Sequence, residues 1–160
     1  MIRRLAVAAA ALGLMALSCP DETRWAIESE IMRSVEATRT EDIDMFMKGV
    51  PADLVVRHAD GSILDAEQLR EDVLAQWAAV ERTYAIETTI DRMETNRDRS
   101  VTVWTSSRWD RVVIRPDGSR SRVVSTRKHR EVWRRRAAQW FQYESEDLGG
   151  ETRVDGTLQS

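Results

Sequence analysis

The chain has 160 residues, which is enough for one domain with a hydrophobic core and too few for two domains of ordinary size. Its formal net charge is −3, so the strongly basic balance of a typical nucleic-acid-binding protein is absent. The chain contains one cysteine, which excludes a disulfide framework within the protein.

The first residues have the layout of a bacterial secretory signal, because arginines at 3–4 precede an apolar run at 5–17 and small residues follow. That run of about 13 residues is shorter than the roughly 20 that span a bilayer. Residues 16–19 (ALSC) resemble a lipoprotein cleavage box that would lipidate Cys19, and they also resemble an ordinary signal-peptidase site. We therefore predict a signal peptide at 1–19 and an exported protein. We expect the exported protein to be periplasmic, to be anchored to the membrane through a lipid on Cys19, or to be secreted.

Helical spacing of apolar residues dominates residues 21–50. Ile27, Ile31 and Val35 form the stripe of a first helix. A second, shorter helix follows an acidic cap at 40–42 and ends near Gly49. Both helices are expected to cover one face of a sheet.

A strand, a tight turn and a second strand are predicted at 52–64, with the turn at Asp60 and Gly61. Asp65 then begins a third helix. Gln68 stands three residues later, which is the spacing of a capping box, and the apolar stripe continues to Trp77.

From Thr83 onward the pattern alternates with period two and is rich in β-branched residues, which predicts long strands joined by short hairpin turns. The predicted strands are 83–93, 100–114, 121–133 and 138–145. Helices followed by an antiparallel meander indicate an α+β domain at 21–148. Residues 149–160 are polar and glycine-rich, so we expect a flexible C-terminal tail.

This order of elements resembles the nuclear transport factor 2-like superfamily, particularly its SnoaL-like and ketosteroid isomerase-like branch. The resemblance rests on segments 41–61, 69–77 and 129–145 and covers roughly residues 24–147. It implies a cystatin-like fold, in which a cone-shaped, strongly curved antiparallel sheet wraps over N-terminal helices. It also implies a pocket for a small apolar ligand and a homodimer formed through the sheet.

An ungapped match to the isomerases places Ser34 at the position of their tyrosine, His58 at the position of their general base and Arg130 near their late-strand acid. Ser34 and Arg130 replace the tyrosine and the aspartic acid that donate hydrogen bonds to the enolate in those isomerases, so isomerase activity is not carried over. His58 is nevertheless a competent base, since the pKa of an ordinary histidine is about 6.5.

Counting residues back from each predicted turn gives the cross-strand pairs, and these pairs predict a polar cluster on one face of the sheet. A turn at 116–118 sets Thr105 opposite His129, and a three-residue turn centred on Arg136 sets His129 opposite Tyr143. These side chains would orient a substrate, with His129 or Tyr143 as the partner of His58. The predicted ligand pocket comprises Ser34, Trp25, Trp77, Trp104, Thr105 and Arg130.

Between Arg108 and Arg136 the chain carries eleven lysines and arginines against three acidic residues. In extended strands they point to both faces, whereas a nucleic-acid groove would collect them on one. We interpret them as charged strand faces that pair with the acidic helices, within one chain or across a dimer, with no nucleic-acid partner. An alternative is attraction to anionic lipid headgroups beside a lipid anchor.

Two functional hypotheses follow. The first is a small-molecule-binding or accessory protein of the cell envelope. The second is a cofactor-independent isomerase, lyase or cyclase with a histidine general base. His58 and His129 are the chain's two histidines and lie far apart in sequence, so we expect no metal site and no cofactor.

Overall fold

The structure is a computed structural model that describes residues 20–159. The predicted signal and Cys19 lie outside the described residues. None of the described helices is long and apolar enough to cross a lipid bilayer.

Three helices occur where the sequence predicts them: α1 (Pro20–Thr40), α2 (Ile43–Met47) and α3 (Ala66–Ala78). The N-cap of α2 is Asp42, whose side chain accepts a hydrogen bond of 2.8 Å from the Met45 backbone. The predicted capping box of α3 is confirmed, because Asp65 and Gln68 exchange side-chain-to-backbone hydrogen bonds of 2.9 and 3.0 Å.

The sheet is built from four long strands and three short ones. Its order is β2-β1-β6-β5-β4-β3, and β7 pairs with the end of β6. The pairs are antiparallel except β1 with β6, which is parallel. The strands are β1 (Val55–Arg57), β2 (Ile63–Leu64), β3 (Val80–Thr95), β4 (Val101–Ile114), β5 (Arg120–Arg136), β6 (Gln139–Val154) and β7 (Thr157–Leu158).

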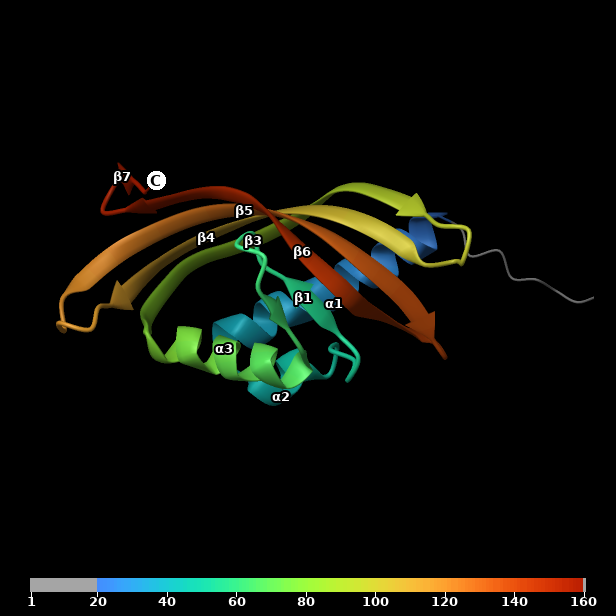
Figure 1. Cartoon of the computed structure of the whole chain (residues 1–160), viewed down its shortest axis with the longest axis horizontal. Coiled ribbons are helices and arrows are strands. Elements are labelled where there is room, and N and C mark those ends of the chain that lie inside the picture. Colours follow the sequence, from blue (N-terminus) through green and yellow to red (C-terminus); the bar gives the residue numbers. More distant parts are fainter. Residues whose placement is uncertain (1–19, 160) are drawn as a thin grey trace, which may run out of the picture.

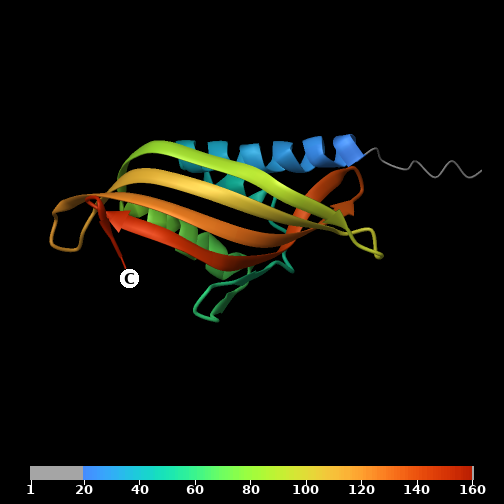
Figure 2. The same ribbon diagram turned by 90° about the horizontal axis from the view of Figure 1, so that it is seen from above.

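The helices lie on one face of the curved sheet, with α1 along one half and α3 beneath the other (Figure 1). We call this the inner face. The opposite, outer face of β3–β6 is left uncovered by the described elements (Figure 2). The predicted α+β fold, with a strongly curved sheet over N-terminal helices, is confirmed.

Side chains alternate regularly between the two faces along β4 and β5, because this pair keeps one register from Val101 to Ile114 without a bulge. Odd-numbered residues of both strands point to the inner face. The core forms there, where Ile27 of α1 packs against Val101, Val103, Trp133 and Trp140.

Three tight turns share the sequence Asp-x-Ser, at residues 60–62, 98–100 and 117–119. In each, the aspartate Oδ1 accepts hydrogen bonds of 2.6 to 3.1 Å from the serine backbone N–H and hydroxyl. The middle residue has a positive φ of 87, 67 or 79°. Each of these hairpins therefore closes through local contacts of its own.

The predicted register of the last hairpin is wrong. The turn has two residues, 137–138, between the paired Arg136 and Gln139, and a bulge follows at Val132 and Trp133. As a result His129 pairs with Asp147, not with Tyr143.

The predicted flexible tail is also wrong for most of its length. β6 continues to Val154, where it still pairs with β5. Gly149 adopts a φ of 89°, and a Cβ on Gly150 would lie 1.9 Å from the carbonyl oxygen of Thr126. The two glycines thus form an irregularity within a strand, and a close approach to β5 requires the second of them.

The basic segment at 108–136 forms ion pairs within the molecule. Its acidic partners lie on strands or in the β6–β7 turn. Arg120 contacts Glu81 at 2.7 Å and Arg130 contacts Glu146 at 2.7 Å. The buried carboxylate of Asp110 accepts a hydrogen bond of 2.8 Å from the Arg122 guanidinium. The hydrogen bonding and the positive charge of Arg122 hold the pKa of Asp110 below its ordinary value.

Candidate functional site

A buried carboxyl group is the main polar feature of the inner face. Glu131 of β5 is 8% exposed. Thr105 Oγ1 donates a hydrogen bond of 3.1 Å to its Oε1, and Trp133 Nε1 donates one of 2.8 Å to its Oε2. Burial raises the pKa of Glu131 above its ordinary value of 4.5, and the two hydrogen bonds only partly oppose this. The protonated carboxyl is therefore favoured beyond the usual pH range.

His129 lies on the same face of β5, two residues from Glu131, and pairs with Thr105 and Asp147 on the flanking strands. Burial lowers the pKa of His129 below 6.5. The Asp147 carboxylate opposes this shift, whereas the positive charge of Arg127 adds to it. The imidazole is thus mainly neutral at neutral pH and can accept a proton.

His58 follows β1 directly. Because Arg57 pairs with Glu146 in parallel, the next residue along reaches the level of Asp147. Its backbone N–H donates a hydrogen bond of 2.9 Å to Ser62 across the hairpin, and its charged form would lower the pKa of His129 further. The structure therefore brings the two histidines into one region, although they are far apart in sequence.

Exposure is graded across this site. His58, His129 and Asp147 are half-buried, whereas Thr105 and Glu131 are buried, with exposed fractions of 1% and 8%. Solvent therefore reaches the imidazoles, and the carboxyl group lies beyond them.

Of the predicted site residues, Thr105 and His129 occupy this region and are paired as predicted. Tyr143 does not join them, because it lies at the β6 irregularity beneath the guanidinium of Arg134, 5.1 Å from its ring centre. Arg130 points to the outer face, where it binds Glu146.

The predicted aromatic lining is dispersed. Trp104 lies on the outer face with Arg92 4.6 Å over its ring, and Trp25 on α1 is 70% exposed. Trp77 of α3 is buried and meets Phe46 edge-on at 6.1 Å. Ser34 is half-buried within α1, where its carbonyl accepts the Thr38 hydroxyl at 3.0 Å.

Sequence reasoning missed Glu131 and Asp147. The family match placed the late-strand acid near Arg130, one residue away from Glu131. The parity of the strand could have identified Glu131, because it shares a face with His129. Asp147 could not be placed beside His129 without the bulge that shifts β6.

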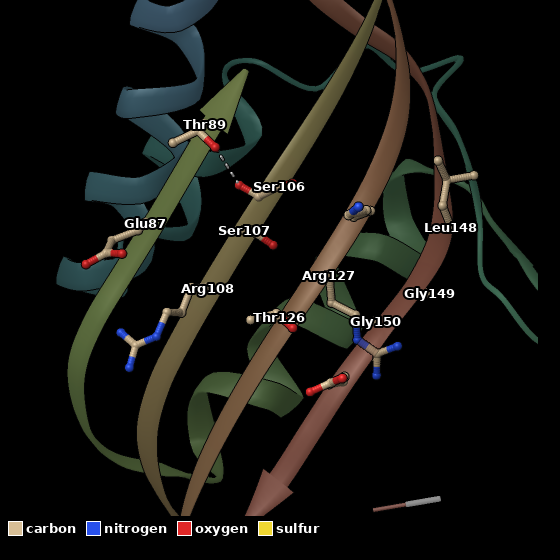
Figure 3. A pocket seen from close by; sticks show the side chains of 12 residues that line it. Glu87, Thr89, Ser106, Ser107, Arg108, Thr126, Arg127, Leu148, Gly149 and Gly150 are labelled. Atoms are coloured by element: carbon tan, nitrogen blue, oxygen red, sulfur yellow. Dashed lines mark hydrogen bonds between the residues drawn. The ribbon is translucent and has the colours of Figure 1, made fainter. Parts of the chain in front are cut away.

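A concave region lies on the outer face, across β3 to β6 (Figure 3). Its volume is about 550 Å³, and Glu87, Ser106, Arg108, Lys128 and Gly150 are among the residues that line it. Its charged side chains carry both signs. The buried acid lies on the other face, so we take the inner face as the candidate site.

Within residues 20–159, no three histidine, cysteine, aspartate or glutamate side chains are grouped as metal ligands would be. The polar cluster on the inner face is thus a set of hydrogen-bonding and proton-accepting groups.

No family model and no curated protein matches the chain. Solved structures do match. A type 2 hexachlorocyclohexane dehydrochlorinase (LinA) superposes with a TM-score of 0.67 and 13% identity, over 86% of this chain and 89% of that one.

A nuclear transport factor 2-like protein from Cytophaga hutchinsonii gives a TM-score of 0.62 and 13% identity, over 78% of this chain and 95% of that one. A ketosteroid isomerase-like protein from Erwinia carotovora atroseptica gives a TM-score of 0.62 and 15% identity, over 81% of this chain and 98% of that one. At such identities the matches show a shared architecture alone.

Proposed function

Because the chain has the nuclear transport factor 2-like, cystatin-like fold, we propose that it binds a small, largely apolar molecule between the inner face of its sheet and its helices. The observation that carries the proposal is the Glu131 carboxyl group, which is buried on that face beside His129. Burying a carboxyl group is costly unless it is bonded or protonated, and here two neighbours hold it in place.

The chemistry of the site suits a ligand that carries an oxygen. A protonated carboxyl group has one O–H to donate, and a carbonyl or hydroxyl oxygen of the ligand would accept it. His129, held neutral by burial, offers a ring nitrogen as a second contact. The apolar part of the ligand would replace water against the core residues next to Glu131.

A second candidate function is a cofactor-independent isomerase, lyase or cyclase of the SnoaL-like type. It is favoured by the pairing of His129 with Asp147, because a carboxylate beside a neutral imidazole stabilises the imidazolium that forms when the histidine removes a proton. His58 at the same level supplies a second base. In this candidate Glu131 would hydrogen-bond the oxygen on which negative charge develops.

The proposal includes export, and its support is the pattern of residues 1–19. The mature protein would act in the cell envelope or outside the cell, attached through Cys19 or free. Intact mass of the protein recovered from its native host decides this: extra mass on Cys19 means a lipoprotein, and an uncleaved N-terminus contradicts export.

The binding proposal is tested by native mass spectrometry of the protein purified from its native host, followed by affinity measurements with the molecule that co-purifies. Glu131→Gln should weaken binding, whereas Glu146→Gln should not, because Glu146 bonds Arg130 on the outer face. Equal affinities of both variants and the wild type would contradict the site. His58→Ala separates the two candidates, since unchanged turnover and affinity would remove the enzyme.

A further inference from the structure

Arg111 is an arginine on the inner face of β4, near the end of that strand. Its guanidinium lies 5.4 Å from the centre of the Trp109 ring. Its Nε is buried and has no hydrogen-bond partner among the described residues. Burial is the single cause that lowers the pKa of Arg111, and no carboxylate opposes it.

Neighbouring arginines of the outer face are different, because each meets an acid. Arg108 and Arg122 share Asp110, at 3.4 and 2.8 Å, and Arg130 binds Glu146 at 2.7 Å. A desolvated guanidinium without a counter-charge is costly to bury. The buried Nε of Arg111 is a donor without a partner among the described residues, which favours a ligand that would supply an acceptor.

Ser107 carries the second unsatisfied group. Its Oγ is buried and has no hydrogen-bond partner within residues 20–159. Among the described residues, this atom and the Nε of Arg111 are the buried side-chain atoms without a hydrogen-bond partner. Ser107, Trp109 and Arg111 alternate along one strand and share the inner face. Because buried polar groups in proteins are nearly always bonded, two such atoms in one row point to a missing partner.

The chemistry of this row suits a carboxylate. A guanidinium presents parallel N–H donors that match the two carboxylate oxygens, and a serine hydroxyl adds a donor. The Trp109 ring, over which the guanidinium lies, helps to hold it in place. Ser107 is also two residues from Thr105, about 7 Å along the strand, so the level of His129 is within reach of a ligand of two fused rings.

We propose that Arg111 and Ser107 bind the carboxylate group of a small apolar acid, whose body lies along the inner face from Ser107 toward His129. The inference rests on the proposed function, because it names the ligand class of the same site. In this arrangement the neutral end of the ligand contacts His129 and Glu131, and the charged end contacts Ser107 and Arg111 on β4.

The test compares 2-naphthoate with 2-naphthamide, which has nearly the same shape and no charge. Binding to the mature chain is measured by calorimetry and by quenching of tryptophan fluorescence. Naphthoate should bind about 10-fold or more tightly than naphthamide, as charge-assisted hydrogen bonds predict. Arg111→Gln should abolish this preference and leave naphthamide affinity unchanged, and Ser107→Ala should reduce the preference by a smaller factor.

Arg92→Gln is the matched control, because Arg92 also lies over a tryptophan but on the outer face. It should keep the full preference. Should Arg111→Gln fail to fold by circular dichroism, Arg111→Lys keeps the charge but not the paired donors, and it should lose most of the preference.

The outcomes separate the two proposals. Equal affinity of wild type for both probes overturns the carboxylate site while the binding function stands. A preference that survives in both Arg111 variants also overturns the site. If neither probe binds, the carboxylate site is overturned, and the co-purified ligand decides the proposed function independently.

Discussion

Thr105 Oγ1 donates a hydrogen bond of 3.1 Å to Glu131 Oε1, although the residue opposite Thr105 in the ladder is His129. The bond is therefore diagonal and joins the buried acid to the strand that carries Ser107 and Arg111. It holds the carboxyl group in one orientation beside the imidazole. Thr105 thus helps to position the carboxyl group of the proposed site.

Replacing Thr105 by valine should test this bond, because valine keeps the shape and removes the donor. We expect a loss of about 1 kcal/mol in the free energy of unfolding and a further rise in the pKa of Glu131. Urea unfolding and NMR titration measure the two effects. Thr89→Val, on the exposed outer face, should change the stability by less than half as much, and equal losses would contradict the assignment.

Glu131→Gln should make the protein more stable at neutral pH. The folded-state pKa of Glu131 is raised, so its contribution to stability is most favourable below about 4.5 and declines as pH rises through the folded-state value. The glutamine cannot ionise. The gain of the variant over wild type should therefore grow with pH, as followed by urea unfolding at several pH values, and a gain independent of pH would refute the argument.

His129 should titrate below 6.5 in NMR spectra of its ring protons, because burial disfavours the imidazolium. The unfolded chain binds this proton more readily, so His129 lowers stability progressively as pH falls below 6.5. Asp147→Asn should move the midpoint lower still, since it removes the opposing charge. His58→Ala should move it upward and also assigns the two histidine signals.

Helices, caps and two hairpins could be predicted from the sequence because their determinants are local. The capping box involves only Asp65 and Gln68, which lie within one helical turn of each other. Asp117 and Gly118 likewise form a hairpin turn through local contacts. The register of β5 and β6 could not be predicted, since Ala137 adopts a positive φ of 55° without being glycine or asparagine. A bulge between the Val132 and Trp133 pairs then shifts the remaining pairs.

The candidate site was predictable only in part, for the same reason. Thr105 and His129 follow from a turn that the sequence marks clearly. Glu131 required knowing which face of β5 is buried, and Arg111 required knowing that no acid reaches it. Both are properties of the packed sheet and not of the strand pattern.

Acid should destabilise the Asp-x-Ser turns. Hydrogen bonds from Ser62, Ser100 and Ser119 hold the pKa values of the three turn aspartates below 3.8. Their contribution to stability is present above about 3.8 and is lost as pH falls through the lower folded-state values. In a variant with asparagine at all three positions, the melting temperature should fall less between pH 7 and pH 2.5 than it does in the wild type. An equal loss would show that the turns are not responsible.

Gly150→Ala should destabilise the protein by about 2 kcal/mol or more, because the new methyl group would overlap the Thr126 carbonyl and force β6 away from β5. Thermal unfolding measures the loss. Gly61→Ala is the comparison, since its Cβ would meet nothing within 4 Å and only the strain of its positive φ would be felt. A smaller effect at Gly150 than at Gly61 would contradict the close approach.

The length of β6 also determines where the chain can be shortened. Residues Val123 to Arg127 of β5 are paired with β4 on one side and with the last part of β6 on the other. A chain cut after Leu148 would turn this stretch of β5 into an open edge rich in β-branched residues. Open edges of that kind recruit strands from other molecules, so such a truncation should favour aggregation rather than remove an idle tail.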